Sequence, residues 1–492
     1  MSKQDFAMFS ATETARLVKR KEISPVEVVE SAIERVEAAN GVLNVVILKG
    51  YEDARLTAQR LERRLLSGEP TGLMAGVPTL MKDLFSFKPG WANTLGGVKA
   101  LRNFVPDFYS NFAHRMESAD AIVIGKSNSA TMGFAGTTDN KLFGPTKNPF
   151  NPALNSGGSS GGSAAVASLM VPLAEGSDAG GSIRIPSSWC GLVGYQPSFG
   201  VSPMVMRPNA FGATAPFIFE GPMARSVQDI ALAMQVLSGK NVQDPYNTSC
   251  PVDFGAALLQ SVEGMRIGLT LDFGVFPVDP QIRTQVEEAS RAFTAAGAIV
   301  EPISLKLPYS AVELAELWCR MISAVTFGAL TNLAENGFDL LGEHSDDLPD
   351  QLIAWVERAE RMTLREIQSD QAMRTEVFDT LTAAFEHFDF ICSPVTCCMP
   401  VPNADGGDTV GPNHLLETTL EPRIGWAMTF LTNLTGNPSA VLPTGLVAGL
   451  PVGLQLIGKR NRDVDLIAAC AAFERARPWA SIYAVPGKER HF

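Results

Sequence analysis

Residues 157–186 read GGSSGGSAAVASLMVPLAEGSDAGGSIRIP, and they constrain the fold of this 492-residue chain more than any other segment. By composition alone, residues 157–163 resemble a flexible linker. The run SAAVASLM that follows is typical of a helix, however, and free backbone N–H groups gather at a helix N-terminus. A second glycine pair, Gly180 and Gly181, comes immediately before Ser182. Two tight serine-bearing loops on either side of one helix therefore predict a site where hydroxyls and backbone donors meet.

Short apolar runs alternate with helical patterns along much of the chain. AIVIG at 121–125 and RIGLTL at 266–271 are typical of buried strands, whereas residues 279–297 have the apolar spacing of an amphipathic helix. This alternation indicates an α/β fold. Because 46% of the residues are hydrophobic and 19% charged, the chain can bury a large core.

Two helices are expected in the first forty residues. Ser24 is typical of an N-cap, Pro25 fits the first helical position, and Glu27 completes a capping box. Residues 309–387 interrupt the α/β alternation, because their pattern is mostly helical and more charged. We expect a helical insertion or cap there.

Residues 424–458 carry no charged side chain, and this segment is long enough to cross a bilayer. A helix there would be interrupted by Pro438, Pro443 and Pro451 together with Gly436, Gly445, Gly449 and Gly453, and lipid cannot satisfy the broken backbone. The segment therefore predicts buried strands and turns, with LPVGLQLIG at 450–458 as one core strand. The N-terminal residues lack the apolar stretch of a signal peptide, so we expect a cytoplasmic protein that does not bind membranes.

The charge and the cysteines exclude several function classes. Lysine and arginine number 40 against 52 acidic residues, and a formal charge of −12 offers no surface for nucleic acid. The odd number and scattered spacing of the cysteines favour reduced thiols over disulfides or a zinc site. We expect no metal and no cofactor. The seven positions are Cys190, Cys250, Cys319, Cys392, Cys397, Cys398 and Cys470.

Two local motifs fail on inspection. GKS at 125–127 would need a glycine at position 120 to form a phosphate loop, and Asp120 stands there. Residues 157–161 match G-x-S-x-G, but a nucleophile elbow must follow a strand, and the preceding KNPFNPALNS predicts no buried one.

Residues 157–198 are similar, nearly residue for residue, to the serine- and glycine-rich core of the amidase signature family. Four further blocks occur in the family's order: GVPTLMKDLF at 76–85, the segment 125–152, GPMARSVQDIA at 221–231, and LTGNPSAVLPTG at 434–445. The resemblance is weakest at about 250–390. It implies one domain over residues 1–492, with a large twisted mixed β-sheet covered by helices on both faces and the helical insertion at 309–387.

The resemblance implies a Ser, cis-Ser, Lys catalytic arrangement. Ser182 matches the nucleophile, Ser159 the serine with the cis peptide bond, and Lys82 the general base. A serine hydroxyl needs a positioned proton acceptor to attack an amide, and desolvation can lower the pKa of a lysine enough to serve. Asp83, the neighbour of Lys82, could oppose this by favouring the cation, and the sequence leaves the balance open.

The resemblance also implies a set of backbone donors for the oxyanion. Side chains at Gly180 and Gly181 would block a close backbone approach. Asp178 and Arg184 flank the nucleophile and are expected to brace the loop, and Cys190 is expected to be inert. The donors are the N–H groups of Ala179, Gly180, Gly181 and Ser182. The residues expected to bind substrate are Met132, Gly133, Gly158 and Trp318.

The chain departs from the family pattern in two ways. The spacing between Ser159 and Ser182 is one residue shorter than usual, so the motif rather than the count assigns Ser159. The family often carries an acidic residue near Thr131, which is missing here.

We expect a stand-alone hydrolase of a small hydrophobic or aryl amide, anilide or carbamate, acting through an acyl-enzyme on Ser182. Its partners would be the amide and water, with a homodimer left open. The apolar segments 316–333 and SPMVMRPNAFG at 202–212 favour this hypothesis. The alternatives are the glutaminase subunit of a tRNA-dependent amidotransferase and a non-catalytic binding protein on the same fold.

Overall fold

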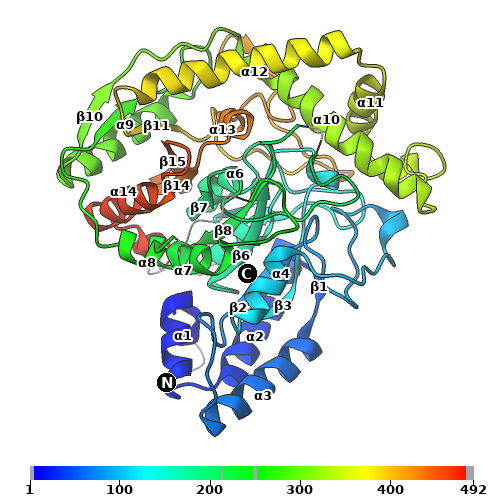
Figure 1. The fold of residues 1–492 in the computed structure, drawn as a ribbon, viewed down its shortest axis with the longest axis vertical. Coiled ribbons are helices and arrows are strands. Elements are labelled where there is room, and N and C mark those ends of the chain that lie inside the picture. Colours follow the sequence, from blue (N-terminus) through cyan, green and yellow to red (C-terminus); the bar gives the residue numbers. More distant parts are fainter. Residues whose placement is uncertain (1–4, 213, 248–251, 484–492) are drawn as a thin grey trace.

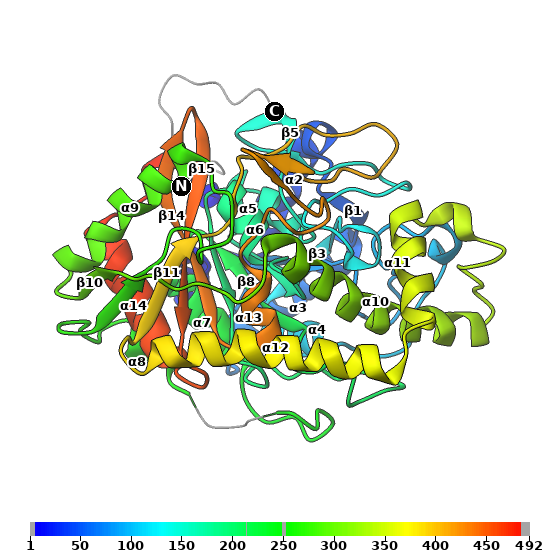
Figure 2. The same ribbon diagram turned by 90° about the horizontal axis from the view of Figure 1, so that it is seen from above.

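The computed structural model describes residues 5–212, 214–247 and 252–483. Their fold is centred on a mixed sheet of eleven strands (Figures 1 and 2). Strand β2 is parallel to β3 and β6, and β9 is parallel to β10 and β11, whereas the other neighbours are antiparallel. In spatial order the strands are β1 (Val46–Lys49), β3 (Ile122–Ser127), β2 (Pro78–Lys82), β6 (Leu173–Asp178), β8 (Phe219–Ala224), β7 (Val193–Gln196), β14 (Ser439–Val447), β15 (Leu450–Gly458), β11 (Phe390–Pro394), β9 (Arg266–Leu269) and β10 (Ile299–Pro302).

Helices flank this sheet. Every residue of β2, β3, β6, β7, β8 and β11 is buried, so both faces of the central sheet are covered, as the α/β prediction requires. The helices are α1 (Ala11–Lys19), α2 (Pro25–Leu43), α3 (Tyr51–Ser67), α4 (Asn111–Ser118), α5 (Gly162–Ala167), α6 (Arg184–Trp189), α7 (Val227–Leu237), α8 (Phe254–Ala257), α9 (Pro280–Ala295), α10 (Ala311–Glu335), α11 (Asp350–Glu360), α12 (Leu364–Phe385), α13 (Phe430–Thr435) and α14 (Asp463–Ala476).

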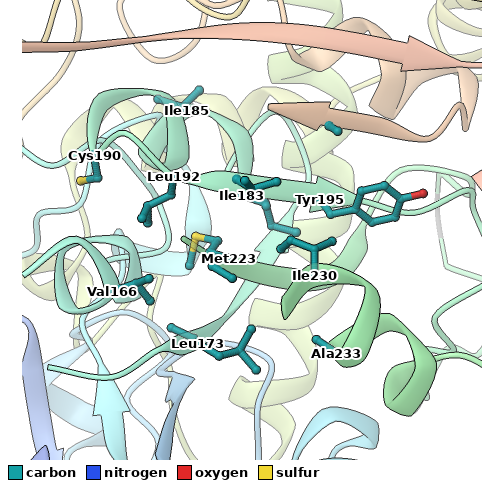
Figure 3. Packing of buried hydrophobic residues seen from close by; sticks show 14 of the residues in the cluster. Val166, Leu173, Ile183, Ile185, Cys190, Leu192, Tyr195, Met223, Ile230 and Ala233 are labelled. Carbon is teal, nitrogen blue, oxygen red and sulfur yellow. The ribbon is translucent and has the colours of Figure 1, made fainter. Parts of the chain in front are cut away.

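The core around the serine- and glycine-rich segment 157–186 includes branched aliphatic side chains and a methionine. Figure 3 shows Val166 of α5, Leu173 of β6 and Met223 of β8 converging between the sheet and its helices. All three side chains are fully buried. Burying each contributes about 1.5–3 kcal/mol, and truncating Met223 to Ala would cost roughly 2–5 kcal/mol.

The N-terminal prediction is confirmed. Helix α2 starts at Pro25, and Ser24 caps it by accepting a hydrogen bond from Val26 N at 3.0 Å while its own N–H donates to Glu27 at 3.4 Å. The alanine-rich helix after Gly161 is shorter than predicted, because α5 ends at Ala167 and Leu169 takes a left-handed φ of 66°.

The charge-free segment folds mainly as predicted. Strand β15 coincides with LPVGLQLIG and pairs with β14, but residues 430–435 form the helix α13 where strands and turns were expected. The two-stranded sheet of β4 (Lys147–Asn148) and β5 (Asn151–Asn155) was not predicted; β5 precedes the glycine loop but is partly exposed, so it is not a buried strand. In the described part of the chain, no helix is long and apolar enough to cross a membrane.

Residues 309–387 form three α-helices, α10 to α12, and a short 3-10 helix at Ser345–Asp347; α10 packs on α11 (Figure 2). Arg374 of α12 donates hydrogen bonds to the carbonyls of Thr214, Pro216 and Leu434. These helices are therefore attached to the rest of the chain near the start of β8. That they are an insertion in one amidase domain stays a prediction.

Candidate active site

Lys82 is the last residue of β2, an interior strand between β3 and β6, and its side chain is completely buried. Its Nζ lies 2.9 Å from Ser159 Oγ, 3.1 Å from Ser177 Oγ and 3.2 Å from Ser177 O. Burial lowers the pKa of Lys82 to about 7, although Glu175 and Asp178 favour the cation. A large share of this amine is therefore neutral at neutral pH.

The carboxylates that oppose neutral Lys82 are not the one considered from the sequence. Asp83 accepts a hydrogen bond from Thr94 N at 3.1 Å and lies 3.7 Å from Lys126 Nζ. Glu175 of β6 instead accepts a hydrogen bond from the Lys82 backbone N–H at 2.8 Å. Glu175 was not predicted as a site residue, although an acidic residue within the serine- and glycine-rich segment 157–186 was a usable signal.

Ser159 lies in the loop before α5 and is buried. The peptide bond between Gly158 and Ser159 is cis, as the resemblance implies. A Cβ atom on Gly133 would lie 3.7 Å from Ser159 Oγ, and one on Gly158 would overlap the carbonyl carbon of Thr137 at 2.0 Å. Gly133 therefore lies beside Ser159, whereas the backbone of Thr137 leaves no room for a side chain at Gly158.

Ser182 lies in the loop that joins β6 to α6, where two side chains from distant segments hold the backbone. Trp318 Nε1 of α10 donates to Ala179 O at 2.7 Å, and Thr429 Oγ1 donates to Gly180 O at 2.6 Å. A Cβ on Gly180 would lie 2.5 Å from Trp318 Nε1, and one on Gly181 would lie 2.0 Å from Thr429 Oγ1. Gly181 also has a φ of 130°. The glycines are thus required by these two protein neighbours, Trp318 and Thr429.

Asp178 and Arg184 form the brace expected from the sequence. Both are fully buried and their side chains form a two-pronged ion pair, with Arg184 Nε to Asp178 Oδ2 and Nη2 to Oδ1 both at 2.9 Å. Burial by itself would raise the pKa of Asp178, but the charge and hydrogen bonds of Arg184 hold it below its usual range. Asp178 Oδ1 also accepts the Gly181 N–H at 2.6 Å. Of the four predicted oxyanion donors, Gly181 is therefore already engaged.

The remaining predicted residues lie around this loop. Trp318 is buried and its ring packs at 5.9 Å from that of Phe134. Met132 is 8% exposed and its N–H donates to Leu95 O. Trp318 thus contacts the loop that carries Ser182 directly, whereas Met132 precedes Gly133, which lies beside Ser159.

The cysteines and the acidic residues bear on two expectations, an inert thiol and no metal site, within the ranges that the structure describes. Six cysteines there are free and buried, and Cys250 lies outside those ranges. Burial raises the pKa of Cys190 to about 12, in agreement with the expected inertness. No three His, Cys, Asp or Glu side chains in the described ranges are grouped to hold a metal ion.

A pocket opens where β7 ends and β8 begins. The two apolar segments singled out in the sequence both contribute to it, through Met204 and Met206 of 202–212 and Val325 of α10. Met132 and Trp318, which were expected to bind substrate, are not among its lining residues.

Comparison with known proteins gives consistent results. A family model described as Amidase matches residues 27–467. An acylamidase of Rhodococcus erythropolis is 32% identical over 98% of both chains. One subunit of the glutamyl-tRNA(Gln) amidotransferase of Geobacter metallireducens is 30% identical, over 94% of this chain and 96% of its own.

Solved structures agree. The crystal structure of a bacterial aryl acylamidase of the amidase signature family is 48% identical, with a TM-score of 0.96 over 98% of this chain and 99% of that one. A 6-aminohexanoate cyclic dimer hydrolase is 29% identical, with a TM-score of 0.83 over 96% of this chain and 98% of its own.

Proposed function

We propose that this chain hydrolyses small aryl amides with Lys82, Ser159 and Ser182. The premise is that the chain belongs to the amidase signature family and is an amidase acting on carbon–nitrogen bonds. The observation that carries the catalytic assignment is the contact of the buried Lys82 amine with Ser159 Oγ at 2.9 Å. A lysine with a pKa near 7 is suited to general-base catalysis.

In the proposed reaction, Ser182 Oγ bonds to the amide carbonyl carbon and gives its proton to Ser159, which passes its own proton to Lys82. The oxyanion is held by the backbone N–H groups of Ala179, Gly180 and Ser182. The carbon–nitrogen bond then breaks, and Ser159 returns a proton to the departing amine. Water cleaves the acyl-enzyme by the same relay, releasing a carboxylic acid and regenerating Ser182.

Two observations support an aryl substrate. A bacterial aryl acylamidase is 48% identical to this chain over nearly its whole length. Five aromatic and two methionine residues are among the nineteen that line the pocket beside β8, and such side chains suit an aromatic ring.

The test is to incubate the purified chain with acetanilide, an aliphatic amide, a carbamate and glutamine, and to map a fluorophosphonate label by mass spectrometry. We expect anilide turnover without any added protein, tRNA or ATP, and labelling at Ser182 that abolishes activity. Turnover of glutamine alone would instead support the amidotransferase function, and labelling at Ser159 with Ser182 unmodified would refute the assigned nucleophile. The homodimer and the cytoplasmic location stay predictions.

A further inference from the structure

A second buried lysine, Lys126, lies in the strand next to Lys82, and the proposed reaction does not use it. Lys126 belongs to β3, and its side chain is completely buried. Its Nζ makes no hydrogen bond among the described residues, and its ion-pair partner there, Asp83 Oδ1, lies 3.7 Å away. A buried ammonium without hydrogen bonds is costly. Buried groups of this kind are concentrated at functional sites.

Asp83 satisfies Lys126 only in part. The Asp83 carboxylate accepts hydrogen bonds from Thr94, whose N–H donates to Oδ1 at 3.1 Å and whose hydroxyl donates to Oδ2. At 3.7 Å, the contact between Asp83 Oδ1 and Lys126 Nζ is an ion pair but is too long for a hydrogen bond. The ammonium of Lys126 can therefore act on a second carboxylate as well.

The second carboxylate is that of Glu175, on the other side of β2. In the parallel pair of β2 and β3, Met81 lies opposite Lys126. In the pair of β2 and β6, Leu80 lies opposite Ala174, the residue before Glu175. Lys126 and Glu175 are therefore both level with Met81, and side chains at one level of neighbouring strands point to the same face of a sheet. The register thus places an ammonium and a carboxylate on one face, two strands apart.

Glu175 connects Lys126 to the catalytic lysine. Its Oε2 accepts the Lys82 backbone N–H at 2.8 Å, whereas Oε1 has no hydrogen-bond partner among the described residues. Burial raises the pKa of Glu175 to about 7, and the charges of Lys82 and Lys126 oppose this rise. Burial likewise lowers the pKa of Lys126, against the charges of Asp83 and Glu175. One carboxylate therefore interacts with both lysines.

Other charged and polar groups face this cluster from neighbouring elements. The charge of Glu175 acts on Glu220, which also faces α4, and a fixed ion pair faces Lys82. Within the described ranges, the positive charges that act on Glu175 are those of Lys82 and Lys126. The groups that face the cluster are Glu220 of β8, Asn111 and Arg115 of α4, Ser86, and Asp178 of β6 with its partner Arg184.

We propose that Lys126 is a positioning residue of the amidase reaction and acts through Glu175. Its ammonium keeps the Glu175 carboxylate charged and in place beside Lys82, so that Lys82 binds a proton more tightly than burial alone would allow. A stronger base accepts the proton of the serines more readily. The inference rests on the proposed function, in which Lys82 is the general base.

The first test follows the limb of kcat/KM against pH. Lys126→Met should move this limb to lower pH by roughly half a unit to one unit, as Glu175→Gln should, because either change removes the carboxylate charge beside Lys82. The two substitutions together should shift the limb no further than Glu175→Gln alone. A limb that stays in place or moves to higher pH, as direct repulsion between the lysines would produce, overturns the proposal. Additive shifts also overturn it.

Lys126→Met leaves Asp83 buried without its ion-pair partner and can impair folding. The variant that combines Lys126→Met with Asp83→Asn removes both charges of this pair. Compared with Asp83→Asn alone, it should show the same shift to lower pH. If the combined variant and Asp83→Asn have the same limb, Lys126 has no effect on Lys82 and the proposal fails.

Lys88→Met serves as the control for loss of a buried ammonium. Lys88 is 7% exposed and forms ion pairs with Asp53 at 3.0 Å and Glu117 at 2.7 Å, but its charge is not among those that act on Lys82 or Glu175. Its replacement should leave the limb in place. An equal shift in Lys88→Met would mean that the loss of any buried lysine moves the limb, which refutes a specific role of Lys126.

A titration without turnover separates this inference from the proposed function. In protein that carries ¹³C-labelled lysine, the NMR signal of Lys82, assigned by its loss in Lys82→Ala, reports protonation of the amine. We expect its midpoint at lower pH in Lys126→Met than in the unmodified chain, even if no anilide is hydrolysed. An unchanged or higher midpoint refutes the role of Lys126. A lowered midpoint in a chain that hydrolyses no amide would support that role and refute the proposed function alone.

Discussion

Two clusters of buried charge lie on either side of the end of β6, and they are built in opposite ways. In the cluster of Asp178 and Arg184, all three guanidinium nitrogens of Arg184 donate hydrogen bonds. Besides Asp178, the acceptors include Thr432 Oγ1 at 2.6 Å and Asn433 Oδ1 at 2.7 Å. In the cluster around Lys82, Glu175 Oε1 makes no hydrogen bond among the described residues. Both clusters are fully buried.

The difference separates a charge that stays fixed, on Asp178, from charges that can change with protonation, on Lys82 and Glu175. The partners of Asp178 keep its pKa below the usual range, so its charge does not change near neutral pH and can hold the nucleophile loop. Burial brings the pKa values of both Lys82 and Glu175 to about 7. A proton can therefore be taken up or released beside Ser159 at neutral pH, which is what a relay requires.

The largest expected effect comes from removing the adjustable charge. Lys82→Ala should lower kcat/KM by at least about 10³-fold, because both serines lose their proton acceptor together. Steady-state rates with acetanilide measure the loss, and circular dichroism controls for folding. A variant with near-normal rates and an unchanged pH profile would show that the base lies elsewhere.

Removing the fixed charge should act on stability. Arg184→Met leaves the Asp178 carboxylate buried without its ion-pair partner, and the free energy of unfolding should fall by about 3–5 kcal/mol. Urea denaturation measures it. Adding Asp178→Asn to this variant should recover part of the loss; a single variant that loses less than about 1 kcal/mol would contradict the assigned role.

The pH dependence should report Lys82. Since the neutral amine accepts the proton, kcat/KM should rise with pH along a limb near pH 7. Glu175→Gln removes a carboxylate that favours the cation, so the limb should move to lower pH, by roughly half a unit to one unit.

The matched control is Glu474→Gln. Burial also raises the pKa of Glu474 to about 7, but its carboxylate accepts a hydrogen bond from Val227 N, outside the catalytic cluster. Its replacement should leave the limb in place. Equal shifts in both variants would mean that Glu175 has no specific effect on Lys82.

The smallest effect is expected at Ser163. This serine is buried in α5, and the contact of its Oγ is with Cys190 Sγ at 3.6 Å. Ser163→Ala should change kcat/KM by less than about threefold, whereas Ser159→Ala should be nearly as damaging as Lys82→Ala. Comparable losses at both serines would indicate disruption of the whole loop and not of a relay.

Sequence patterns predicted the features that depend on neighbouring residues. The cap at Ser24, the core strand at 450–458 and the pairing of Asp178 with Arg184 all involve short separations along the chain. The contacts that define the site instead join residues that are far apart in the sequence. Glu175 meets Lys82 across 93 residues.

Thr429 meets Gly180 across 249 residues. Such contacts depend on the strand order and register, which a single sequence does not specify. Helix α13 escaped prediction for a related reason: its six residues are all buried, so they show no amphipathic period that distinguishes a helix from a strand.

The indole of Trp318 has a consequence for protein engineering. It comes from α10 but occupies the space that a side chain at Gly180 would fill, and it holds Ala179 O at 2.7 Å. Exchanging the helices at 309–387 for those of a relative would therefore also exchange one wall of the nucleophile loop. Only donor segments that bring a tryptophan to this position are expected to give active chimaeras, so the three helices are not a freely exchangeable module.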